Sequence, residues 1–358
     1  MREIIKFDPE FAGFIEPRLF SFSVENNKIK DVDMEVGYAH RGIEKLMMER
    51  PYKNDLLLAE RVCGICSNSH SSCFAMALEK LTETEISNRA KYIRIIMLEM
   101  ERLHSHLLYF VLICKALDEF DLLIKLVAVR ERLMSLIKSI SGNRVNYSIN
   151  TFGGVKRDIS TEVTPDILDN LDEINILSEK LVTELDPKNS IGNKTFGIGN
   201  LTTEMAGKLG TVGPNLRASG IDEDLRRDAK YLSYEDFEFD VIVLNIGDVR
   251  ARALTRALEI IQTVRIIENA LENLPEGELR VQPGNLKTGE VISRIEAPRG
   301  ELAYFVKSDG SNIPHTIKIR TPTFANYLSL KHMLIGQEVD YAHLIIESID
   351  PCISCTDR

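Results

Sequence analysis

Residues 85–115 read EISNRAKYIRIIMLEMERLHSHLLYFVLICK. Their apolar side chains recur at steps of three and four residues: Ile86, Ala90, Ile93, Met97, Met100, Leu103, Leu107 and Val111. This spacing places the apolar side chains along one side of an α-helix. A helix of about 30 residues is much longer than the usual ~10–14 residues. We therefore expect long helices to dominate the middle of the chain.

Further helices are predicted at residues 121–141, 165–185, 248–273 and 322–349. Residues 150–154, with two adjacent glycines, are expected to form a loop. Residues 189–217 are rich in glycine, and we expect irregular structure there rather than an element of the core.

Two β regions flank the helices. Residues 19–36 alternate between apolar and polar side chains and predict a hairpin that turns at Asn26-Asn27. Residues 291–319 alternate in the same way around Asp309-Gly310-Ser311-Asn312. The predicted fold class is therefore an α-rich α+β fold, a central bundle of long helices with small β-hairpins or sheets at the N-terminal and C-terminal parts. We expect a single interlocked domain over residues 1–358, with a β region at 1–53, a helical core at 54–290, and a β patch with C-terminal helices at 291–358.

Composition and charge exclude several classes of protein. The chain has 358 residues, 44% of them hydrophobic and 27% charged, with a net charge of −10 and no block rich in lysine and arginine. This argues against a nucleic-acid-binding surface. The longest apolar runs fall far short of the ~18 residues of a membrane span, and Asp8-Pro9 interrupts the N-terminus before a signal peptide could form. We expect a cytoplasmic protein that reaches a membrane only through partner proteins.

Four of the six cysteines form two Cys-x-x-Cys pairs. The first pair is Cys63 with Cys66 and the second is Cys352 with Cys355, and 286 positions separate them (352 − 66). A local zinc ribbon has a gap of only ~15–20 residues, so the fold itself must bring the pairs together. Spacing alone leaves open a structural zinc site, an iron-sulfur site and unrelated buried cysteines. Cys73 and Cys114 have no partner at metal-binding spacing and are interpreted as packing residues.

The residues around both pairs resemble a known family. The first motif reads Arg61-Val62-Cys63-Gly64-Ile65-Cys66-Ser67-Asn68-Ser69-His70 and the second Asp350-Pro351-Cys352-Ile353-Ser354-Cys355. They resemble the Arg-x-Cys-Gly-x-Cys-x-x-x-His and Asp-Pro-Cys-x-x-Cys signatures of nickel-iron hydrogenase large subunits. Further pieces match in order along the chain: Glu16, Arg41-Gly42-Ile43-Glu44 and Glu296-Ala297-Pro298-Arg299-Gly300. The resemblance therefore extends from residue 16 to residue 358.

The subtype of the resemblance can be narrowed. The sequence around His40 reads Gly37-Tyr38-Ala39-His40-Arg41-Gly42-Ile43-Glu44-Lys45-Leu46. It resembles the 49 kDa quinone-site subunit of respiratory complex I, which is related to the hydrogenases but lacks their metal-binding cysteines. A chain with both features resembles the membrane-bound, energy-converting (Ech-type) hydrogenases. Arg358 stands where most other groups place a magnesium-binding histidine, which leaves a magnesium site in doubt. Because the chain ends just past Cys355, it resembles the mature form that remains after a C-terminal extension is removed.

The resemblance implies a role for each cysteine. Cys63 and Cys352 would be terminal nickel ligands, whereas Cys66 and Cys355 would bridge nickel to an iron that carries carbon monoxide and two cyanides. When hydrogen is split, Cys352 would receive the proton, since a terminal sulfur is more basic than one shared by two metals. Glu16 would accept that proton next. A solvated strand carboxylate is the alternative for Glu16.

Other residues would surround the metals. The resemblance places the Arg299 guanidinium over the open nickel position, with Asp350 as its orienting partner; an ordinary salt bridge is the alternative. His70 would donate to a bridging sulfur or simply be a buried histidine. Pro298 and Thr323 would line the diatomic ligands, with Thr323 bonded to a cyanide. Arg41 and Glu44 would lie nearby, where they would equally form a structural ion pair with each other.

The implied function is the catalytic subunit of an energy-converting nickel-iron hydrogenase. Hydrogen would be reversibly split into protons and electrons, and the electrons would pass to an iron-sulfur small subunit and a ferredoxin-type carrier. Further cluster-carrying subunits and integral membrane subunits would couple this to ion translocation at the cytoplasmic face of the membrane. No iron-sulfur cluster is expected in this chain, since it has no cysteines to spare. The alternatives are a complex I-type quinone-site scaffold without a metal, and a zinc-stabilised interaction module.

Overall fold

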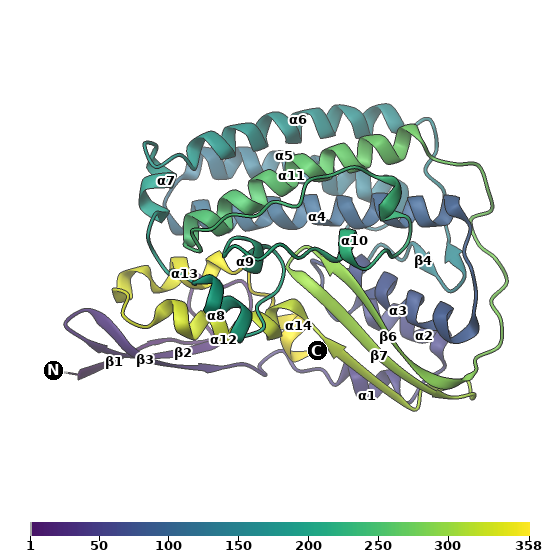
Figure 1. The fold of residues 1–358 in the computed structure, drawn as a ribbon, viewed down its shortest axis with the longest axis horizontal. Helices are drawn as coiled ribbons and strands as arrows, with labels where there is room; N and C mark the ends of the chain where they lie inside the picture. Colours follow the sequence, from purple (N-terminus) through teal and green to yellow (C-terminus); the bar gives the residue numbers. More distant parts are fainter. Residues whose placement is uncertain (1) are drawn as a thin grey trace.

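A bundle of long helices forms one layer of the protein. The computed structural model describes residues 2–358, and Figure 1 shows the long helices lying side by side along the molecule. They are α4 (Asn88–Ala116), α5 (Phe120–Ser141), α6 (Thr164–Glu184) and α11 (Val249–Glu272). Helix α4 begins three residues later than the pattern predicts, because Ser87 caps it by accepting a hydrogen bond from the Ala90 N–H at 3.1 Å.

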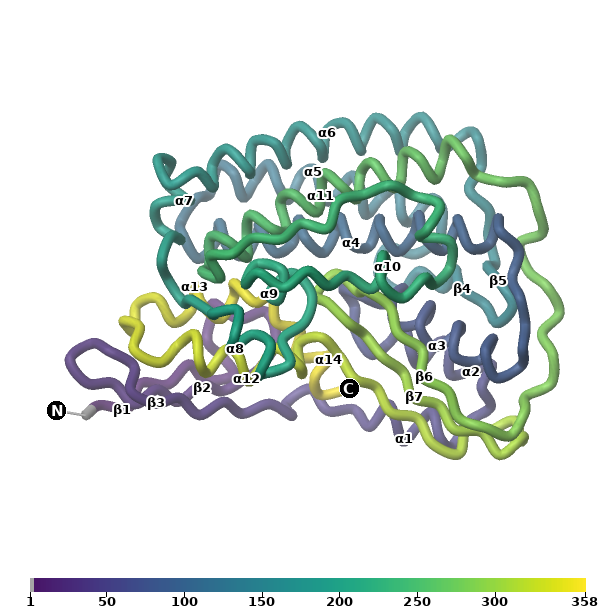
Figure 2. The backbone as a smooth tube through the Cα atoms, in the orientation of Figure 1, coloured from purple at the N-terminus to yellow at the C-terminus, as the bar shows by residue number. Residues whose placement is uncertain are grey.

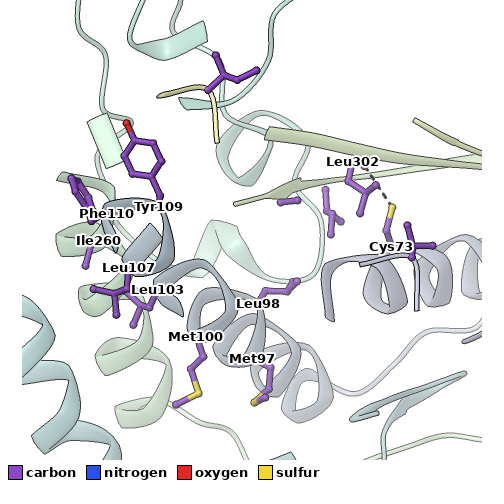
Figure 3. Packing of buried hydrophobic residues seen from close by; sticks show 14 of the residues in the cluster. Cys73, Met97, Leu98, Met100, Leu103, Leu107, Tyr109, Phe110, Ile260 and Leu302 are labelled. Carbon is purple, nitrogen blue, oxygen red and sulfur yellow. Dashed lines mark hydrogen bonds between the residues drawn. The ribbon is translucent and has the colours of Figure 1, made fainter. Parts of the chain in front are cut away.

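Helix α4 is the centre of the core. Its apolar stripe packs on α11, and Figure 3 shows this packing around Leu103, Leu107 and Ile260, which are all buried. Charged residues of α4 are also buried, and Glu99 pairs with Arg102 at 3.0 Å. The sequence pattern predicts an amphipathic helix with one face exposed to solvent. The structure differs because other parts of the chain enclose these charges: Arg226 and, from α11, Thr263 donate to Glu99, and Arg102 donates to the backbone oxygen of Glu296.

Two antiparallel sheets lie below the bundle (Figure 1). The N-terminal sheet has the order β1-β2-β3 and turns at Asn26-Asn27, where both residues have positive φ (52° and 61°). The C-terminal sheet has the order β6-β7-β8. Its strands and those of the first sheet are β1 (Arg2–Phe7), β2 (Leu19–Glu25), β3 (Lys28–Glu35), β6 (Thr288–Ala297), β7 (Gly300–Asp309) and β8 (Thr316–Arg320). The predicted fold class, α-rich with small sheets at both ends, is confirmed.

Shorter helices connect these layers. Helix α3 covers the C-terminal sheet, and the Cys73 thiol contacts the backbone oxygen of Leu302 in β7 at 3.7 Å (Figure 3). The elements are α1 (Ile43–Met47), α2 (Tyr52–Glu60), α3 (Ser67–Thr82), α7 (Ser190–Thr195), α8 (Thr203–Lys208), α9 (Pro214–Arg217), α10 (Leu225–Asp228), α12 (Pro322–Leu334), α13 (Ala342–Ser348) and α14 (Ile353–Asp357), with 3-10 turns at Tyr234–Asp236 and Val339–Tyr341.

Three local predictions need correction. Residues 322–349 are not one helix, because Gly336 has φ +84° and its N–H donates to the Ile29 oxygen at 2.8 Å, so the chain runs beside β3 before α13 begins. Residues 150–154 are not only a loop: β4 (Asn150–Thr151) and β5 (Gly154–Val155) pair there. The glycine-rich residues 189–217 contain the short helices α7, α8 and α9.

The two chain ends occupy different places. Figure 2 shows the N-terminal strand at one edge and the C-terminus near the middle, beside α14. No helix within residues 2–358 combines the length and the hydropathy needed to cross a membrane.

Candidate metal centre

The fold brings the two Cys-x-x-Cys pairs together. Cys63 and Cys66 lie in the turn between α2 and α3, whereas Cys352 directly precedes α14 and Cys355 lies within it. The sulfur atoms of Cys63 and Cys352 are 3.2 Å apart, and those of Cys66 and Cys355 are also 3.2 Å apart. All four side chains are buried and none is in a disulfide. They form one compact set of sulfur donors.

The four sulfurs have the chemistry of a metal-binding pocket. Hydrogen bonds from Cys352, Cys355 and Cys66 lower the pKa of Cys63 well below its usual value, so the set stabilises a thiolate. Contacts with thiol neighbours and burial raise the pKa values of Cys66 and Cys355. Thiolates are the metal-binding form of cysteine, and soft sulfur sites select metals such as zinc and iron. The donor set therefore fits a metal group with several sulfur ligands.

Arg41 fastens the two motifs to each other. Its guanidinium donates to the backbone oxygens of Arg61 at 2.6 Å and Val62 at 2.9 Å, just before Cys63. It also donates to the backbone oxygen of Ser354 at 2.8 Å, between the second pair of cysteines. The Arg41 side chain thus fixes the distance between the two cysteine motifs. It does so without an ion pair to Glu44, which the sequence leaves as an alternative.

Glu44 instead binds the last residue of the chain. Its carboxylate accepts from the Arg358 Nε at 2.8 Å, the Ile319 N–H at 2.9 Å and the Lys318 Nζ at 3.0 Å. Burial would raise the pKa of Glu44, but these three donors outweigh it and lower the pKa. The Arg358 guanidinium lies beside Glu44, where a hard cation would need the carboxylate, so this corner does not fit magnesium. The exposed His40 bonds the Asp357 oxygen at 2.8 Å.

Glu16 lies at the start of α14, beside Cys352. Its two carboxylate oxygens accept from the Ile353 N–H at 2.5 Å and the Ser354 N–H at 3.1 Å, and the Ser354 hydroxyl donates to it as well. A segment more than 330 positions away in the sequence thus holds the second cysteine motif. Glu16 is partly buried, so it is not the solvated strand carboxylate of the alternative reading.

The Arg299 guanidinium faces the cysteines from the β6–β7 turn, next to the buried Pro298. It donates to the Asp350 Oδ1 at 2.7 Å, the Asp350 backbone oxygen at 2.8 Å and the Ser105 hydroxyl at 3.0 Å. Burial would lower the pKa of Arg299, but the charges of Asp350 and the cysteines outweigh it and raise the pKa. A permanent positive charge therefore lies against the sulfur pocket.

The β6–β7 turn is held by a close backbone approach. A Cβ atom on Gly213 would lie 2.4 Å from the Gly300 Cα, so no larger residue fits between the two segments. Arg102 of α4 also donates to the Glu296 backbone oxygen at 2.7 Å, at the end of β6. Both contacts position Arg299.

His70 binds one sulfur through one ring nitrogen. Its Nε2 lies 3.5 Å from the Cys355 Sγ, and its Nδ1 lies 2.8 Å from the Tyr304 hydroxyl. Burial lowers the pKa of His70 to about 4, so the ring is neutral and carries one N–H. When the Tyr304 hydroxyl donates to Nδ1, the remaining N–H points at the sulfur. Thr323 accepts from the Cys352 N–H at 3.0 Å, which leaves its own hydroxyl proton free to donate.

Sequence reasoning missed several residues of this site. Glu101 of α4 accepts from the Asn68 N–H at 2.6 Å and the Ser69 N–H at 2.9 Å at the start of α3. Burial raises the pKa of Glu101 to about 8. His104 contacts the Ile65 oxygen at 2.9 Å, inside the first motif. The available signal was a run of polar residues on an otherwise apolar helix. Tyr304 and Ser105 carried no such signal.

Comparisons with known proteins now identify the family. Residues 119–288 and 279–358 match the model of the respiratory-chain NADH dehydrogenase 49 kDa subunit, and residues 41–173 match that of nickel-dependent hydrogenases. The chain belongs to this family of hydrogenase and complex I subunits. The resemblance to the energy-converting hydrogenases and their complex I relatives is confirmed.

Relatives of both kinds are similar over nearly the whole chain. The carbon monoxide-induced hydrogenase of Rhodospirillum rubrum is 33% identical and covers 99% of each chain. The alpha subunit of the membrane-bound hydrogenase of Pyrococcus furiosus is 36% identical over 99% of this chain and 87% of its own. A subunit of the NADH-quinone oxidoreductase of Dehalococcoides mccartyi is 35% identical over 94% of this chain and 92% of its own.

A solved structure has the same fold. A chain of the membrane-bound sulfane sulfur reductase, an archaeal respiratory membrane complex, superposes with a TM-score of 0.94 at 29% identity, over 100% of this chain and 98% of its own. The similar proteins thus include hydrogenases, a subunit of an NADH-quinone oxidoreductase and a chain of a respiratory membrane complex. The similarity to hydrogenases supports an oxidoreductase role, and the reaction depends on the site.

Proposed function

We propose that this chain is the catalytic large subunit of an energy-converting nickel-iron hydrogenase. One observation carries the proposal: four buried cysteine sulfurs converge in pairs 3.2 Å apart beside the Arg299 guanidinium. A complex I-type quinone-site scaffold has no use for such a donor set. That scaffold is the second candidate, because residues 37–46 resemble it and the Dehalococcoides mccartyi oxidoreductase is similar over most of the chain.

The proposed cofactor is a nickel-iron group with carbon monoxide and two cyanides on iron. Cys63 and Cys352 would hold nickel, while Cys66 and Cys355 would hold both metals. When bound, the group would supply the redox chemistry that splits hydrogen. The protein's share of the reaction is to hold the metals, to move the proton and to exclude water. All four cysteine ligands are buried, so the fold excludes water from the metals.

Proton transfer is proposed to begin at the Cys352 sulfur. A sulfur that held one metal would keep more basicity than a shared one, and Glu16 binds the N–H groups of Ile353 and Ser354, the two residues that follow Cys352. A carboxylate within reach of a proton donor serves as a general base. Glu16 would therefore take the proton from the Cys352 Sγ and pass it outward.

Arg299, Asp350 and His70 are proposed to tune the site. Asp350 holds the Arg299 guanidinium in place with two hydrogen bonds. Its positive charge would stabilise negative charge that develops at the thiolates. His70, fixed by Tyr304, would donate to the bridging Cys355 sulfur and lower its charge. Thr323 would donate its free proton to a diatomic ligand, and Pro298 would line that side.

Electrons are proposed to leave through partner proteins. Among the described residues, Cys73 and Cys114 are the cysteines outside the centre, and both are buried in the hydrophobic core. A cluster in an iron-sulfur small subunit would therefore take the electrons and pass them to a ferredoxin-type carrier. Further cluster-carrying and integral membrane subunits would anchor the complex at the cytoplasmic face of the membrane.

Metal analysis and infrared spectroscopy of the native complex test this function. Nickel and iron in equal amounts, with infrared bands of carbon monoxide and cyanide, are the expected result. Zinc alone would assign the centre to an interaction module. A complex that contains the chain but no metal at these cysteines would leave the quinone-site scaffold as its role.

A further inference from the structure

A group of buried polar atoms beside the metal centre lacks hydrogen-bond partners among residues 2–358. They belong to residues whose charges interact with Glu347 or Arg18, and they are the Arg18 Nε and Nη1, the Asp350 Oδ2, the Tyr109 hydroxyl and the Tyr327 hydroxyl. Buried polar groups in proteins are nearly always bonded to protein or to ordered water. An unpaired buried group costs about 1–3 kcal/mol. Ordered water is the partner that buried polar groups of this kind commonly have.

Glu347 lies within this polar region. It is on α13, its side chain is 2% exposed, and it accepts a hydrogen bond from the Arg18 Nη2. Its Oε1 also lies 3.9 Å from the His343 Nε2, one helical turn earlier. The His343 side chain is 21% exposed, and its Nε2, which faces Glu347, is a further buried atom without a partner among the described residues. Glu347 therefore stands between the unpaired atoms and the protein surface.

The region also reaches the metal centre. The Asp350 Oδ1 binds Arg299, whose charge interacts with three of the cysteines, and the unpaired Asp350 Oδ2 belongs to the same carboxylate. The charge of Asp350 is also felt by Glu347 and by the Tyr109 hydroxyl. Asp350 and Glu347 are also neighbours in space, because the Asp350 N–H donates to the Glu347 backbone oxygen at 2.9 Å, and none of these contacts involves Glu16.

The charges around Glu347 suit a group that exchanges protons at neutral pH. Arg18, Lys115 of α4 and His343 of α13 face it, while Arg252 and Arg256 of α11 bind the neighbouring Ser348. Burial, followed by the charge of Asp350, raises the pKa of Glu347 to about 7 in spite of Arg18. A relay group works best when it gains and loses a proton near the operating pH.

Glu16 is less free to do this work alone. Both of its oxygens already accept hydrogen bonds from α14, and Ser354 donates a further one. Three of its roughly four lone-pair sites are thus occupied, and protonation makes the carboxylate a weaker acceptor for the segment that carries Cys352. A second exit would avoid that coupling.

We infer that Glu347 is a proton-relay residue on a second route between the metal centre and solvent, which runs through buried water from Asp350 to His343. The inference rests on the proposed function. In the outward direction, a water beside Asp350 receives the proton as the Cys352 S–H bond breaks, while another O–H bond of that water breaks and a new O–H bond forms on the Glu347 carboxylate. That bond then breaks toward a water beside His343, so one proton moves and no electron does.

The first test is infrared spectroscopy of the purified complex as the pH is raised from 6 to 8. The wild-type protein should lose the carbonyl band of a buried carboxylic acid near pH 7, and Glu347→Gln should lack that part of the signal. Glu79→Gln is the matched control, because Glu79 is also buried and binds an arginine, Arg94, at 2.6 Å and 2.8 Å away from the centre. An unchanged signal in Glu347→Gln would overturn the inference.

The second test is hydrogen–deuterium exchange activity in a Glu16→Gln background. The residual exchange should fall by a further ~10²-fold when Glu347→Gln is added, and Glu79→Gln should leave it unchanged. Equal residual exchange with and without Glu347→Gln would show that the proton leaves elsewhere. If Glu347→Gln does not fold, as judged by thermal unfolding, Glu347→Asp keeps the carboxylate and should retain both the infrared titration and the exchange.

The outcomes separate this inference from the proposed function. Absence of nickel and iron would remove the hydrogenase assignment, whereas the infrared titration of Glu347 depends only on the protein. Normal metal bands without that titration would remove the relay and leave the hydrogenase intact.

Discussion

Both cysteine motifs reach the pocket from segments whose backbone is fixed by distant side chains. Arg41 holds the turn at Cys63, and Glu16 and Thr323 hold the segment at Cys352. The ligands are therefore positioned before a metal arrives. Losing one sulfur should remove a ligand without disturbing its neighbours.

Cys352→Ser should yield a folded chain without a working nickel site, because a hydroxyl is a poor ligand for a soft-metal position. Nickel content and hydrogen–deuterium exchange should both fall to background. Cys73→Ser is the control, since Cys73 is equally buried and its thiol donates to the Ser293 oxygen, as a hydroxyl also does. Full hydrogen uptake in Cys352→Ser would refute the assignment.

Glu16→Gln should slow exchange by at least about 10²-fold while the carbon monoxide and cyanide bands persist. The amide cannot take a proton, and one of its two terminal atoms still accepts a hydrogen bond from α14. The exposed Glu10→Gln should behave as wild type. Loss of the bands in Glu16→Gln would make Glu16 structural, and normal exchange with intact bands would point to another route.

Asp55 offers a test of pH-dependent stability. Both of its carboxylate oxygens are buried without a partner, and burial raises its pKa from 3.8 to about 8. A raised pKa favours folding at low pH, and that stability is lost as the pH rises from about 4 through about 8. Asp55→Asn should therefore become more stable than wild type by a few kcal/mol at pH 8.5, at ~1.4 kcal/mol per pKa unit, and similar to wild type near pH 4.

Urea unfolding at the two pH values measures this difference. The exposed Asp33→Asn is the control and should show no such change. A stability difference between Asp55→Asn and wild type that is the same at both pH values would contradict the prediction.

At the scale of the elements, hydrophobic periodicity was sufficient for the long helices and for the hairpin at residues 26–27. Sequence reasoning failed where the decisive contacts are distant in sequence. The helix predicted at residues 322–349 is interrupted because the Gly336 N–H donates to the Ile29 oxygen, and Glu44 pairs with Arg358 instead of the nearby Arg41. The cysteine pairs followed from motifs, and Glu16 and Arg299 followed only from the family resemblance. Glu347 and Tyr304 had no sequence pattern that distinguished them, because their properties come from burial and from distant partners.

The bundle provides a matched pair of isoleucines for testing its packing. Ile267 of α11 is fully buried, whereas Ile176 of α6 is 69% exposed. Ile267→Ala should lower the free energy of unfolding by about 2–5 kcal/mol, because it removes buried atoms and leaves a cavity. Ile176→Ala should change it by less than about 0.5 kcal/mol. Equal effects in chemical denaturation would contradict the described packing.

At the scale of the whole molecule, the metal centre joins segments from both ends of the sequence. Removing the metals should loosen residues 349–358, because Cys352 and Cys355 link them to the first motif. Glu16, Arg41 and Glu44 would still hold α14, so the segment should become more accessible without the protein unfolding.

Limited proteolysis of the complex before and after metal removal measures this change. The β2–β3 hairpin at residues 19–35 is the internal control and should be cleaved equally in both states. Equal resistance of residues 349–358 in both states would count against the prediction.

The distance between the cysteine pairs also has a consequence for biosynthesis. Ribosomes add ~5–20 residues per second, so Cys352 emerges roughly 15–60 s after Cys66, which precedes it by 286 positions (352 − 66). Throughout that interval the first pair of thiols is exposed to oxidants and to competing ions, with no second pair to enclose them. Faithful loading must therefore wait until translation has passed Cys355, and delaying the nascent chain should increase capture of the wrong ion.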